Sequence, residues 1–280
     1  MKSFSFRTLF IRFILLFWSV VVVIPFAMLL LTSLKTNPEF YANVWALPQD
    51  LFGSLVINYR EAFARGSIGT NFLNTVYIDT VALIITLTLS AMVSYVIARR
   101  PLRFAPKLYY LYLVGLLIPA MVGLTPMFIM ARFLGLFDTR FILILLYGTS
   151  TIPFCVFVMT AFFRSILNEL EEAASIDGAN LWHIFGRIIL PLVKPAFITA
   201  GIFCFLDYWS EYMKGLMFVV SAEKKTISMG MLTFKIVSGF KIDWGVTAAA
   251  CILFILPVLV LYIAFQRHLI GGLTDGSVKG

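Results

Sequence analysis

Three ionisable side chains lie close together in an otherwise apolar part of the sequence, residues 196–220. Asp207, Glu211 and Lys214 are spaced i, i+4 and i+7, which predicts that they share one face of a helix. In a lipid environment such groups are costly unless they pair or meet water. Three aromatic side chains adjoin this face: Tyr208, Trp209 and Tyr212. Two interpretations stay open, a structural Glu211–Lys214 pair with tyrosines at a membrane interface, or a polar lining for a solute, where flat rings suit the C–H faces of sugars.

A second polar group occupies residues 172–191 and predicts two short helices. The first ends at Asp177-Gly178, because glycine tolerates the left-handed backbone that terminates a helix. Asn180 then caps the second helix through its side-chain oxygen. Four apolar residues of this helix recur at i, i+3, i+4 and i+7 and share one face: Leu181, Ile184, Phe185 and Ile188. The segment is too short and polar to cross a membrane, so we expect lipid headgroups or a partner protein to cover that face.

The composition excludes several classes of function. Apolar residues make up 61% of the 280 residues and charged residues only 13%, which indicates an integral membrane protein. The net charge of +8 does not indicate nucleic-acid binding, because the basic residues cluster at the ends of apolar stretches. The chain has no G-x-x-x-x-G-K-[ST] loop and no H-E-x-x-H motif, and His183 and His268 are isolated. We therefore expect no catalytic residue, no metal and no cofactor bound by this chain.

The three cysteines fall in different apolar stretches: Cys155, Cys204 and Cys251. This distribution favours buried free thiols over a disulfide framework or a metal site.

Six apolar stretches are long enough to cross a bilayer, which takes about 20 residues. We predict an all-α integral membrane protein with a single domain, residues 1–280, and six spans at about 13–32, 76–98, 108–131, 141–163, 196–220 and 244–265. A signal peptide is the alternative for the first stretch, but the run is long and no small-residue cleavage site follows closely. Prolines inside the later spans predict kinks: Pro119, Pro126, Pro153 and Pro257.

Basic residues predict the orientation. Four of them lie between Arg99 and Lys107, just after the second predicted span, and cytoplasmic loops are enriched in Lys and Arg near span ends. With this cluster inside, both termini and the polar loop between the fourth and fifth spans face the cytoplasm.

The polar loop resembles that of the permease subunits of binding-protein-dependent ABC importers. The family pattern is E-A-A, three residues, G, nine residues, I-x-L-P, and it fits without a shift in spacing: Glu172, Ala173, Ala174, Gly178, Ile188, Leu190 and Pro191. Leu167 stands where the family often has Pro, which leaves the start of the loop's first helix open. The resemblance implies that the loop couples the chain to an ATPase, through Glu172, Ala173, Ala174, Asp177, Gly178, Leu181, Ile184, Phe185, Leu190 and Pro191. The carboxylates of Glu172 and Asp177 would then meet a basic groove on the ATPase.

Other residues resemble the maltose-type carbohydrate permeases of this family. Trp209-Ser210-Glu211-Tyr212 is similar to the W-N-E-F stretch of sugar permeases, with Ser and Tyr departing from it. This stretch overlaps the candidate substrate path, which consists of Asp207, Tyr208, Trp209, Glu211 and Tyr212; the pattern does not ask for Asp207. Residues 272–280 are similar to the G-x-x-x-G-x-V-K-G ending, which in the family reaches between the ATPase subunits and implies a second contact through Gly276, Val278, Lys279 and Gly280. Three further stretches fit the subgroup: Asn58-Tyr59-Arg60, Asn74-Thr75 and residues 135–139.

The resemblance implies a permease subunit that forms half of a translocation path for a sugar or oligosaccharide, in the cytoplasmic (inner) membrane of a prokaryote. The implied partners are a homologous second permease, a dimer of ABC ATPases that binds ATP and Mg²⁺, an extracytoplasmic solute-binding protein and lipid. A polyol phosphate is an alternative solute. An ion-coupled secondary transporter is a more distant alternative, which would use Asp79, Asp207 and Glu211, but such folds usually show two related halves and none is found here.

Overall fold

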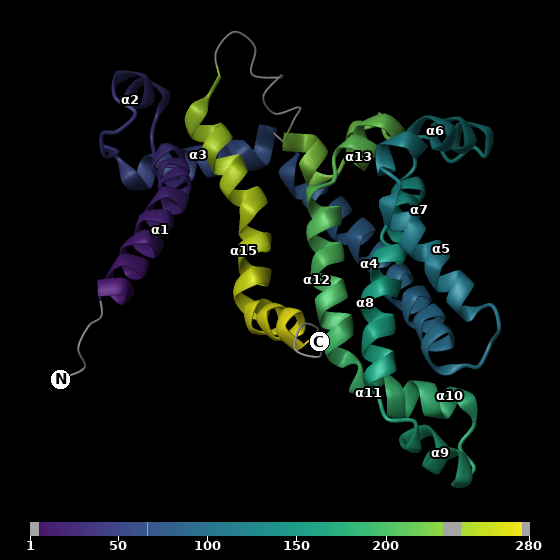
Figure 1. The fold of residues 1–280 in the computed structure, drawn as a ribbon. Helices are drawn as coiled ribbons and strands as arrows, with labels where there is room; N and C mark the ends of the chain where they lie inside the picture. The colour runs from purple at the N-terminus through teal and green to yellow at the C-terminus, as the bar shows by residue number, and fades with distance from the viewer. Residues whose placement is uncertain (1–5, 66, 232–241, 276–280) are drawn as a thin grey trace. The chain divides into compact units, whose positions relative to one another are not determined.

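The structure, a computed structural model, describes residues 6–65, 67–231 and 242–275 (Figure 1). All regular elements in these ranges are helices, which confirms the all-α prediction for this part of the chain. The chain divides into two units, residues 1–69 with 230–257 and residues 70–229 with 258–280. Each unit is described by itself below.

The described residues of the first unit include α1 (Phe6–Ser33), α2 (Asn37–Ala42), α3 (Leu51–Arg65) and the beginning of α15 (Trp244–Asp275). The Asn58 amide on α3 donates to the carbonyls of Ser33 and Lys35, both at 2.9 Å. Carbonyls at the end of a helix have no partner within it, so Asn58 completes the end of α1. The buried Lys35 ammonium donates in turn to the carbonyls of Asn43 and Val44, at 3.2 and 2.6 Å. One asparagine of α3 thus fixes the exit of the chain from α1.

The second unit is built around α8. Its principal helices are α4 (Ile68–Arg99, from residue 70), α5 (Ala105–Leu117), α6 (Leu124–Phe133), α7 (Arg140–Ser150), α8 (Ile152–Ser165), α12 (Lys194–Ser210) and α13 (Met213–Phe218). Both α5 and α12 pack on α8, and α13 packs on α6 and α7. The core includes Tyr147, Met159, Phe163 and Tyr208, each at most 1% exposed. Burial of these large side chains holds the helices of this unit together.

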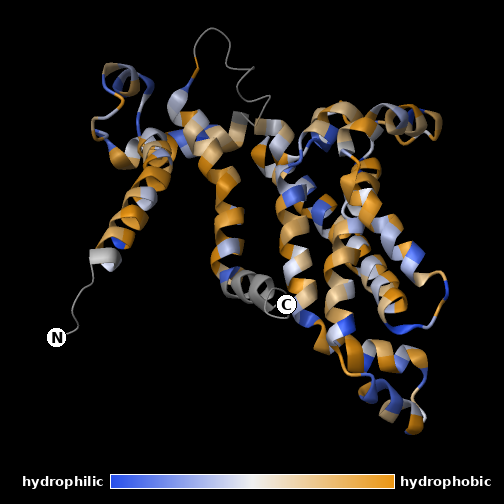
Figure 2. Cartoon of the chain, viewed as in Figure 1, coloured by the Kyte–Doolittle hydropathy of each residue, from blue (hydrophilic) through white to orange (hydrophobic). Residues whose placement is uncertain are grey.

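Among the described residues, three helical stretches are long and apolar enough to cross a membrane, at Thr8–Ser33, Ile68–Arg99 and Trp244–Gln266. Figure 2 shows the hydrophobic colouring of α1 and of the described part of α15. Three further pairs of helices pass together but are bent, by 87° at 118–120, by 41° at residue 151 and by 73° at residue 193. Counting each bent pair as one span gives six, by length and composition only.

Two of the predicted proline kinks coincide with breaks between helices. Pro119 lies between α5 and the 3₁₀ turn η1 (Ala120–Gly123), and Pro153 lies in the first turn of α8, just after the bend. Proline lacks an amide donor and disfavours helix in the residue before it, which accounts for breaks at these places. By contrast, α15 continues through Pro257.

A polar segment, residues 219–227, follows α13 and contains the 3₁₀ turn η3 (Ala222–Lys224). Asp138, in the link between α6 and α7, holds its beginning. One carboxylate oxygen accepts the amides of Val220 and Ser221, both at 2.9 Å, and the other accepts the Ser221 hydroxyl and the Lys224 ammonium. The bonds from Ser221, more than the weaker contributions of Val220 and Lys224, hold the pKa of Asp138 well below its usual range.

Candidate functional site

Two short helices form the polar loop that connects α8 to α12, here called the 169–192 loop (Figure 1). Its elements are α9 (Glu169–Ile176), α10 (Leu181–His183), the π-helical turn η2 (Ile184–Ile189) and α11 (Leu190–Leu192). Gly178 separates the two helices with a φ of +82°, the left-handed conformation that favours glycine. The Ala179 amide donates to the Ala174 carbonyl at 3.0 Å, which closes the end of α9. The Asn180 side chain accepts the His183 amide at 2.9 Å, so both the predicted turn and the predicted cap are confirmed.

The start of α9 at Glu169 shows that the helix forms with Leu167 in place of the family's proline. The apolar face of the second helix differs from expectation. Ile184 is 4% exposed, and Phe185 and Ile188 pack against the core of the same unit. The Phe185 ring lies 4.9 Å from the ring of Tyr95 on α4. The prediction that lipid or a partner covers this face is therefore wrong for these three residues, because the loop folds back on α4. Leu181 alone of the four remains half exposed, at 48%.

The outer surface of the 169–192 loop mixes carboxylates with large apolar side chains. Glu172 and Asp177 are exposed, and so are Ala173, Gly178 and Pro191. Two apolar residues that the sequence analysis did not select are the most prominent: Ile176 is 86% exposed and Trp182 is 69% exposed. Ala174 is buried and Leu190 is half buried. An exposed surface of this kind, polar with a few large apolar side chains, is suited to a protein partner.

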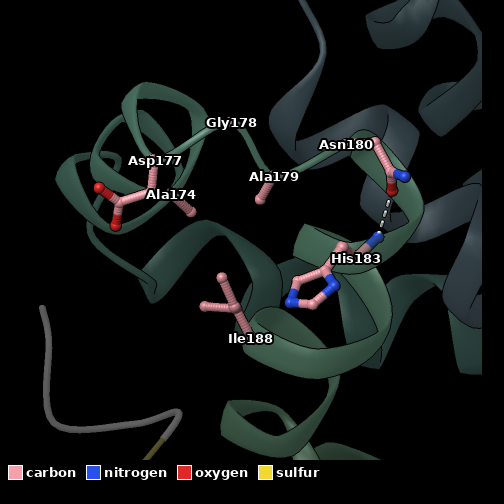
Figure 3. Close-up of a pocket in the computed structure, with 7 residues that line it drawn as sticks. All are labelled: Ala174, Asp177, Gly178, Ala179, Asn180, His183 and Ile188. Carbon is pink, nitrogen blue, oxygen red and sulfur yellow. Dashed lines mark hydrogen bonds between the residues drawn. The ribbon is translucent and has the colours of Figure 1, made fainter.

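A notch of about 400 Å³ lies between the two helices of the loop. Figure 3 shows its lining: Ala174, Asp177, Gly178, Ala179, Asn180, His183 and Ile188. The Ala174, Ala179 and Ile188 side chains point into the space, whereas the Asp177 carboxylate points away from it. Three apolar side chains thus face the notch beside polar groups, and a carboxylate lies at its edge. The apolar side chains suit the stem of a long basic side chain, and the carboxylate suits its charged end.

An ionic cluster that the sequence analysis did not identify fastens the loop to α4. We call it the Glu171 cluster, and it consists of Tyr95, Arg99, Arg100 and Glu171. Arg99 Nε donates to Glu171 Oε1 at 2.7 Å, and the Tyr95 hydroxyl donates to Glu171 Oε2 at 3.1 Å. Arg100 lies 3.6 Å from Glu171 Oε2. The Arg99 side chain is 4% exposed and that of Glu171 is 13% exposed, so the pair is largely shielded from water.

The remaining nitrogens of Arg99 are also used. They donate to the carbonyl of Ile166 at 2.7 Å and to that of Leu167 at 3.1 Å, in the stretch between α8 and α9. The sequence offered one signal for this role, since Tyr95 and Arg99 are spaced i, i+4 and share a helix face. Arg99 was interpreted only as an orientation charge.

The second candidate group lies where α12 ends. The helix stops at Ser210, and Glu211 has an extended backbone, so the three ionisable groups do not share one helix face as predicted. They nevertheless line one pocket of about 370 Å³, here called the Asp207 pocket, together with five other residues: Ser150, Thr151, Phe154, Phe203 and Cys204. Glu211 and Lys214 form an ion pair at 3.2 Å, and the Lys214 ammonium lies 5.6 Å from the centre of the Tyr147 ring. The Glu211–Lys214 pair expected for a structural role is therefore present, and both of its residues line the pocket that a solute-binding role would need.

The aromatic residues predicted beside this group have different surroundings. Tyr208 and Trp209 are 1% and 2% exposed. The Tyr208 hydroxyl bonds with those of Thr86, at 2.8 Å, and Thr151, and its ring stacks on that of Tyr147 at 5.5 Å. These contacts brace the packing of the unit. Tyr212 is 42% exposed and does not line the pocket.

Cys155 and Cys204 are buried free thiols, as predicted, and Cys251 is only partly buried. In the part of the chain that the structure describes, no group of three or more His, Cys, Asp or Glu residues could hold a metal ion. The predicted tail contact, Gly276, Val278, Lys279 and Gly280, lies outside the described residues.

Residues 90–274 match the family described as "Binding-protein-dependent transport system inner membrane component". The match includes the 169–192 loop and the Asp207 pocket and covers more than half of the chain. The chain belongs to this family. It is therefore an integral inner-membrane component of a transport system, and the resemblance drawn from Glu172–Pro191 is confirmed.

Relatives are similar along nearly the whole chain. The diacetylchitobiose uptake system permease protein NgcG of Streptomyces coelicolor is 33% identical over 266 residues, 95% of this chain and 87% of that protein. The melibiose/raffinose/stachyose import permease protein MelC of Bacillus subtilis is 32% identical over 258 residues, 92% of this chain and 91% of that protein. The trehalose transport system permease protein SugB of Mycobacterium tuberculosis is 33% identical over 223 residues, 80% of this chain and 81% of that protein.

Among solved structures, a chain of a bacterial ABC transporter involved in the import of the acidic polysaccharide alginate has a TM-score of 0.82 and 22% identity. The match covers 95% of this chain and 99% of that one. At this identity the likeness shows only the fold, which the present chain shares along almost its full length.

Proposed function

We propose that this chain is the permease subunit of an ATP-driven carbohydrate importer, and that the 169–192 loop is its contact with a separate ATPase. The observation that carries the proposal is the exposed surface of that loop, where the Glu172 and Asp177 carboxylates are exposed and Asp177 lies at the edge of the notch. A basic side chain on a partner would find both a charge to pair with and an apolar slot for its stem. The sequence has no phosphate-binding loop of its own, so ATP and Mg²⁺ belong to the partner.

The proposed assembly contains a homologous second permease, two ATPase subunits and an extracytoplasmic solute-binding protein, in a prokaryotic cytoplasmic membrane. In the proposed topology, six spans leave both termini and the 169–192 loop on one side of the membrane, and the basic residues between Arg99 and Lys107 support the cytoplasm as that side. The tail residues Gly276–Gly280 make the second ATPase contact. When ATP closes the ATPase dimer, the loop moves as one body and the spans pass between inward-open and outward-open states.

Carbohydrate is the proposed class of solute. The relatives with named sugars support it, and so does the chemistry of the Asp207 pocket. Its hydroxyls and carboxylates, from Ser150, Thr151, Asp207 and Glu211, suit a ligand rich in hydroxyl groups. Two carboxylates against the single ammonium of Lys214 make the pocket a poor environment for an anionic polyol phosphate, which argues against the alternative solute.

The coupling role is tested with the complete transporter reconstituted in vesicles. Glu172→Lys reverses a charge on the exposed loop surface, so it should reduce the amount of ATPase that co-purifies and abolish solute-stimulated ATP hydrolysis. Glu223→Lys makes the same charge change at another exposed position of the same unit and should leave ATPase binding unchanged. Normal ATPase binding and normal stimulation in Glu172→Lys would reject the proposed contact.

The proposed orientation is tested by cysteine labelling in a variant without the native cysteines. Leu47 and Ile176 are 79% and 86% exposed, so a cysteine at either position is accessible to a reagent. A membrane-impermeant maleimide added outside should label the first position in intact cells and the second only after lysis. Labelling of position 176 from outside would overturn the orientation.

A further inference from the structure

Helix α4 has polar connections to other elements at three levels along its length. At one end the Glu171 cluster joins it to the 169–192 loop. In the middle the Thr86 hydroxyl donates to the carbonyl of Gly148 on α7 at 2.7 Å and bonds with the Tyr208 hydroxyl on α12 at 2.8 Å. At the other end Asn74 and Thr75 hold the 219–227 segment. All of these contacts lie within the second unit.

The Glu171 cluster connects α4 to both helices of the loop. Glu171 belongs to α9, and Tyr95 reaches it through its hydroxyl. The Tyr95 ring also contacts the second helix of the loop, because it lies against the Phe185 ring in η2. Arg99 adds bonds to the backbone of residues 166 and 167, which lead into α9. The loop cannot turn relative to the end of α4 without breaking several buried polar contacts at once, and breaking such contacts is costly.

The opposite end of α4 is fastened in a comparable way. The Asn74 amide donates to the carbonyls of Glu223 and Lys225, at 2.8 and 2.9 Å. The Thr75 hydroxyl oxygen accepts the amide of Ile227 at 2.8 Å. Arg99 follows Asn74 by 25 positions, which corresponds to roughly 37 Å along an α-helix. Both ends of one continuous helix are therefore bonded to polar segments, and its middle is bonded to α7 and α12, which carry the pocket residues Ser150 and Asp207.

We propose that α4 is the rigid link that transmits movement of the 169–192 loop to the pocket wall and to the 219–227 segment, and that Tyr95, Arg99 and Glu171 are the positioning residues at its driven end. The inference rests on the proposed coupling function of the loop. Transmission needs a contiguous, stiff element, and a continuous helix that is hydrogen-bonded to its neighbours at three levels supplies one. Thr86 extends the same link to Tyr208, beside the pocket residue Thr151.

The experiment measures whether nucleotide binding to the ATPase changes hydrogen exchange in the 219–227 segment, at the far end of α4. The reconstituted transporter is compared with and without Mg²⁺ and a non-hydrolysable ATP analogue, and hydrogen exchange of the 219–227 amides is followed by mass spectrometry. In the unmodified protein the analogue should change this exchange. In Glu171→Gln and Arg99→Lys the nucleotide-dependent change and the stimulated ATP hydrolysis should both fall about 5- to 30-fold. Unstimulated hydrolysis and the amount of assembled complex should stay within twofold of the unmodified protein.

Glu169→Gln is the matched control, because it makes the same chemical change in the first turn of α9 at an exposed side chain. It should leave the nucleotide-dependent exchange intact. Unchanged exchange differences in both Glu171→Gln and Arg99→Lys would overturn the inference, and so would failure of both variants to assemble, since the cluster would then only stabilise the fold. If the unmodified transporter couples ATP to uptake but shows no nucleotide effect at 219–227, the inference fails while the proposed function stands. Absence of ATP-dependent uptake would reject the proposed function itself.

Discussion

Gly178 and Gly186 offer a matched test of how the 169–192 loop is shaped. Both glycines are exposed, and a Cβ added at either position meets no heavy atom within 4 Å. They differ in backbone conformation, because Gly178 has a φ of +82° and Gly186 lies inside the helical turn η2. Any difference between alanine variants therefore arises from the backbone alone.

The expected effects have opposite signs. An alanine at the left-handed position 178 costs about 1–2 kcal/mol, since its Cβ crowds the following carbonyl. An alanine at the helical position 186 gains about 0.5–1 kcal/mol, because glycine loses more conformational freedom on folding. In Gly178→Ala the population of the opened loop should rise roughly 5- to 30-fold. In Gly186→Ala it should fall roughly two- to fivefold.

Limited proteolysis of the reconstituted transporter measures this population directly, because cleavage of an exposed loop follows the fraction that is open when reclosing is fast. Solute-stimulated ATP hydrolysis should fall in Gly178→Ala and stay normal in Gly186→Ala. Gly178→Asn should recover much of the loss, since asparagine tolerates the left-handed region. Equal cleavage rates for the two alanine variants would refute the argument that Gly178 sets the angle between the helices.

Three further perturbations follow from the contacts above. Glu211→Gln removes the carboxylate that pairs with Lys214 and should lower the melting temperature of the purified transporter. The loss in free energy of unfolding should be somewhat less than the about 3–5 kcal/mol of a fully buried pair, because the Glu211 side chain is 18% exposed. The double variant Glu211→Gln/Lys214→Met should recover most of this loss. Asn58→Ala orphans two buried carbonyls at the end of α1, at about 1–3 kcal/mol each, and should lower the melting temperature more than Gly69→Ala, whose Cβ meets nothing. The pKa of Asp138 is lowered in the fold, so its stabilisation is complete above the unfolded value of about 3.9 and is lost as the pH falls below it. The protection of the 219–224 amides, taken relative to the intrinsic exchange rate at each pH, should therefore decrease on acidification below about pH 4, and an already decreased protection that does not change with pH is expected in Asp138→Asn.

The shape of the 169–192 loop could be predicted because short-range chemistry determines it. A glycine after Asp177 ends one helix, and Asn180 begins the next through a bond to an amide three residues away. Neither feature depends on distant parts of the chain. Hydropathy likewise located the three described helices that are long and apolar enough to cross a membrane, Thr8–Ser33, Ile68–Arg99 and Trp244–Gln266, since about 20 consecutive apolar residues give a strong local signal.

The end of α12 could not be predicted in the same way, because tertiary contacts determine it. Residues 213–219 continue the apolar composition of the helix, yet the backbone leaves it at Glu211. The Glu211 carbonyl accepts bonds from the hydroxyls of Tyr147 and Ser228, at 3.3 and 2.7 Å, and its carboxylate accepts the Lys214 amide at 3.0 Å. These bonds compensate for the interrupted helix and begin α13. The first of them joins residues 64 positions apart, which no local pattern records.

Long-range contacts are also the reason why the sequence did not predict the Glu171 cluster or the packing of η2 on α4. Arg99 and Glu171 are 72 positions apart, so a basic residue at a span end was indistinguishable from an orientation charge. The periodicity of the apolar residues Ile184 and Phe185 indicates that they are buried, but it does not identify the element that covers them. In the structure Tyr95 of α4 contacts both Glu171 and Phe185 of the loop.

The two interpretations of the ionisable group near residue 211 are compatible once each residue is considered separately. Glu211 and Lys214 satisfy each other, and Glu211 also begins α13, so their first role is to hold the wall of the pocket. Tyr208 and Trp209 are too deeply buried to meet a solute. Asp207 differs from all four, because its side chain is exposed and lines the pocket. On the proposed carbohydrate path, a sugar in the pocket would meet Asp207 in front of this wall, although the sugar-permease pattern does not include that residue.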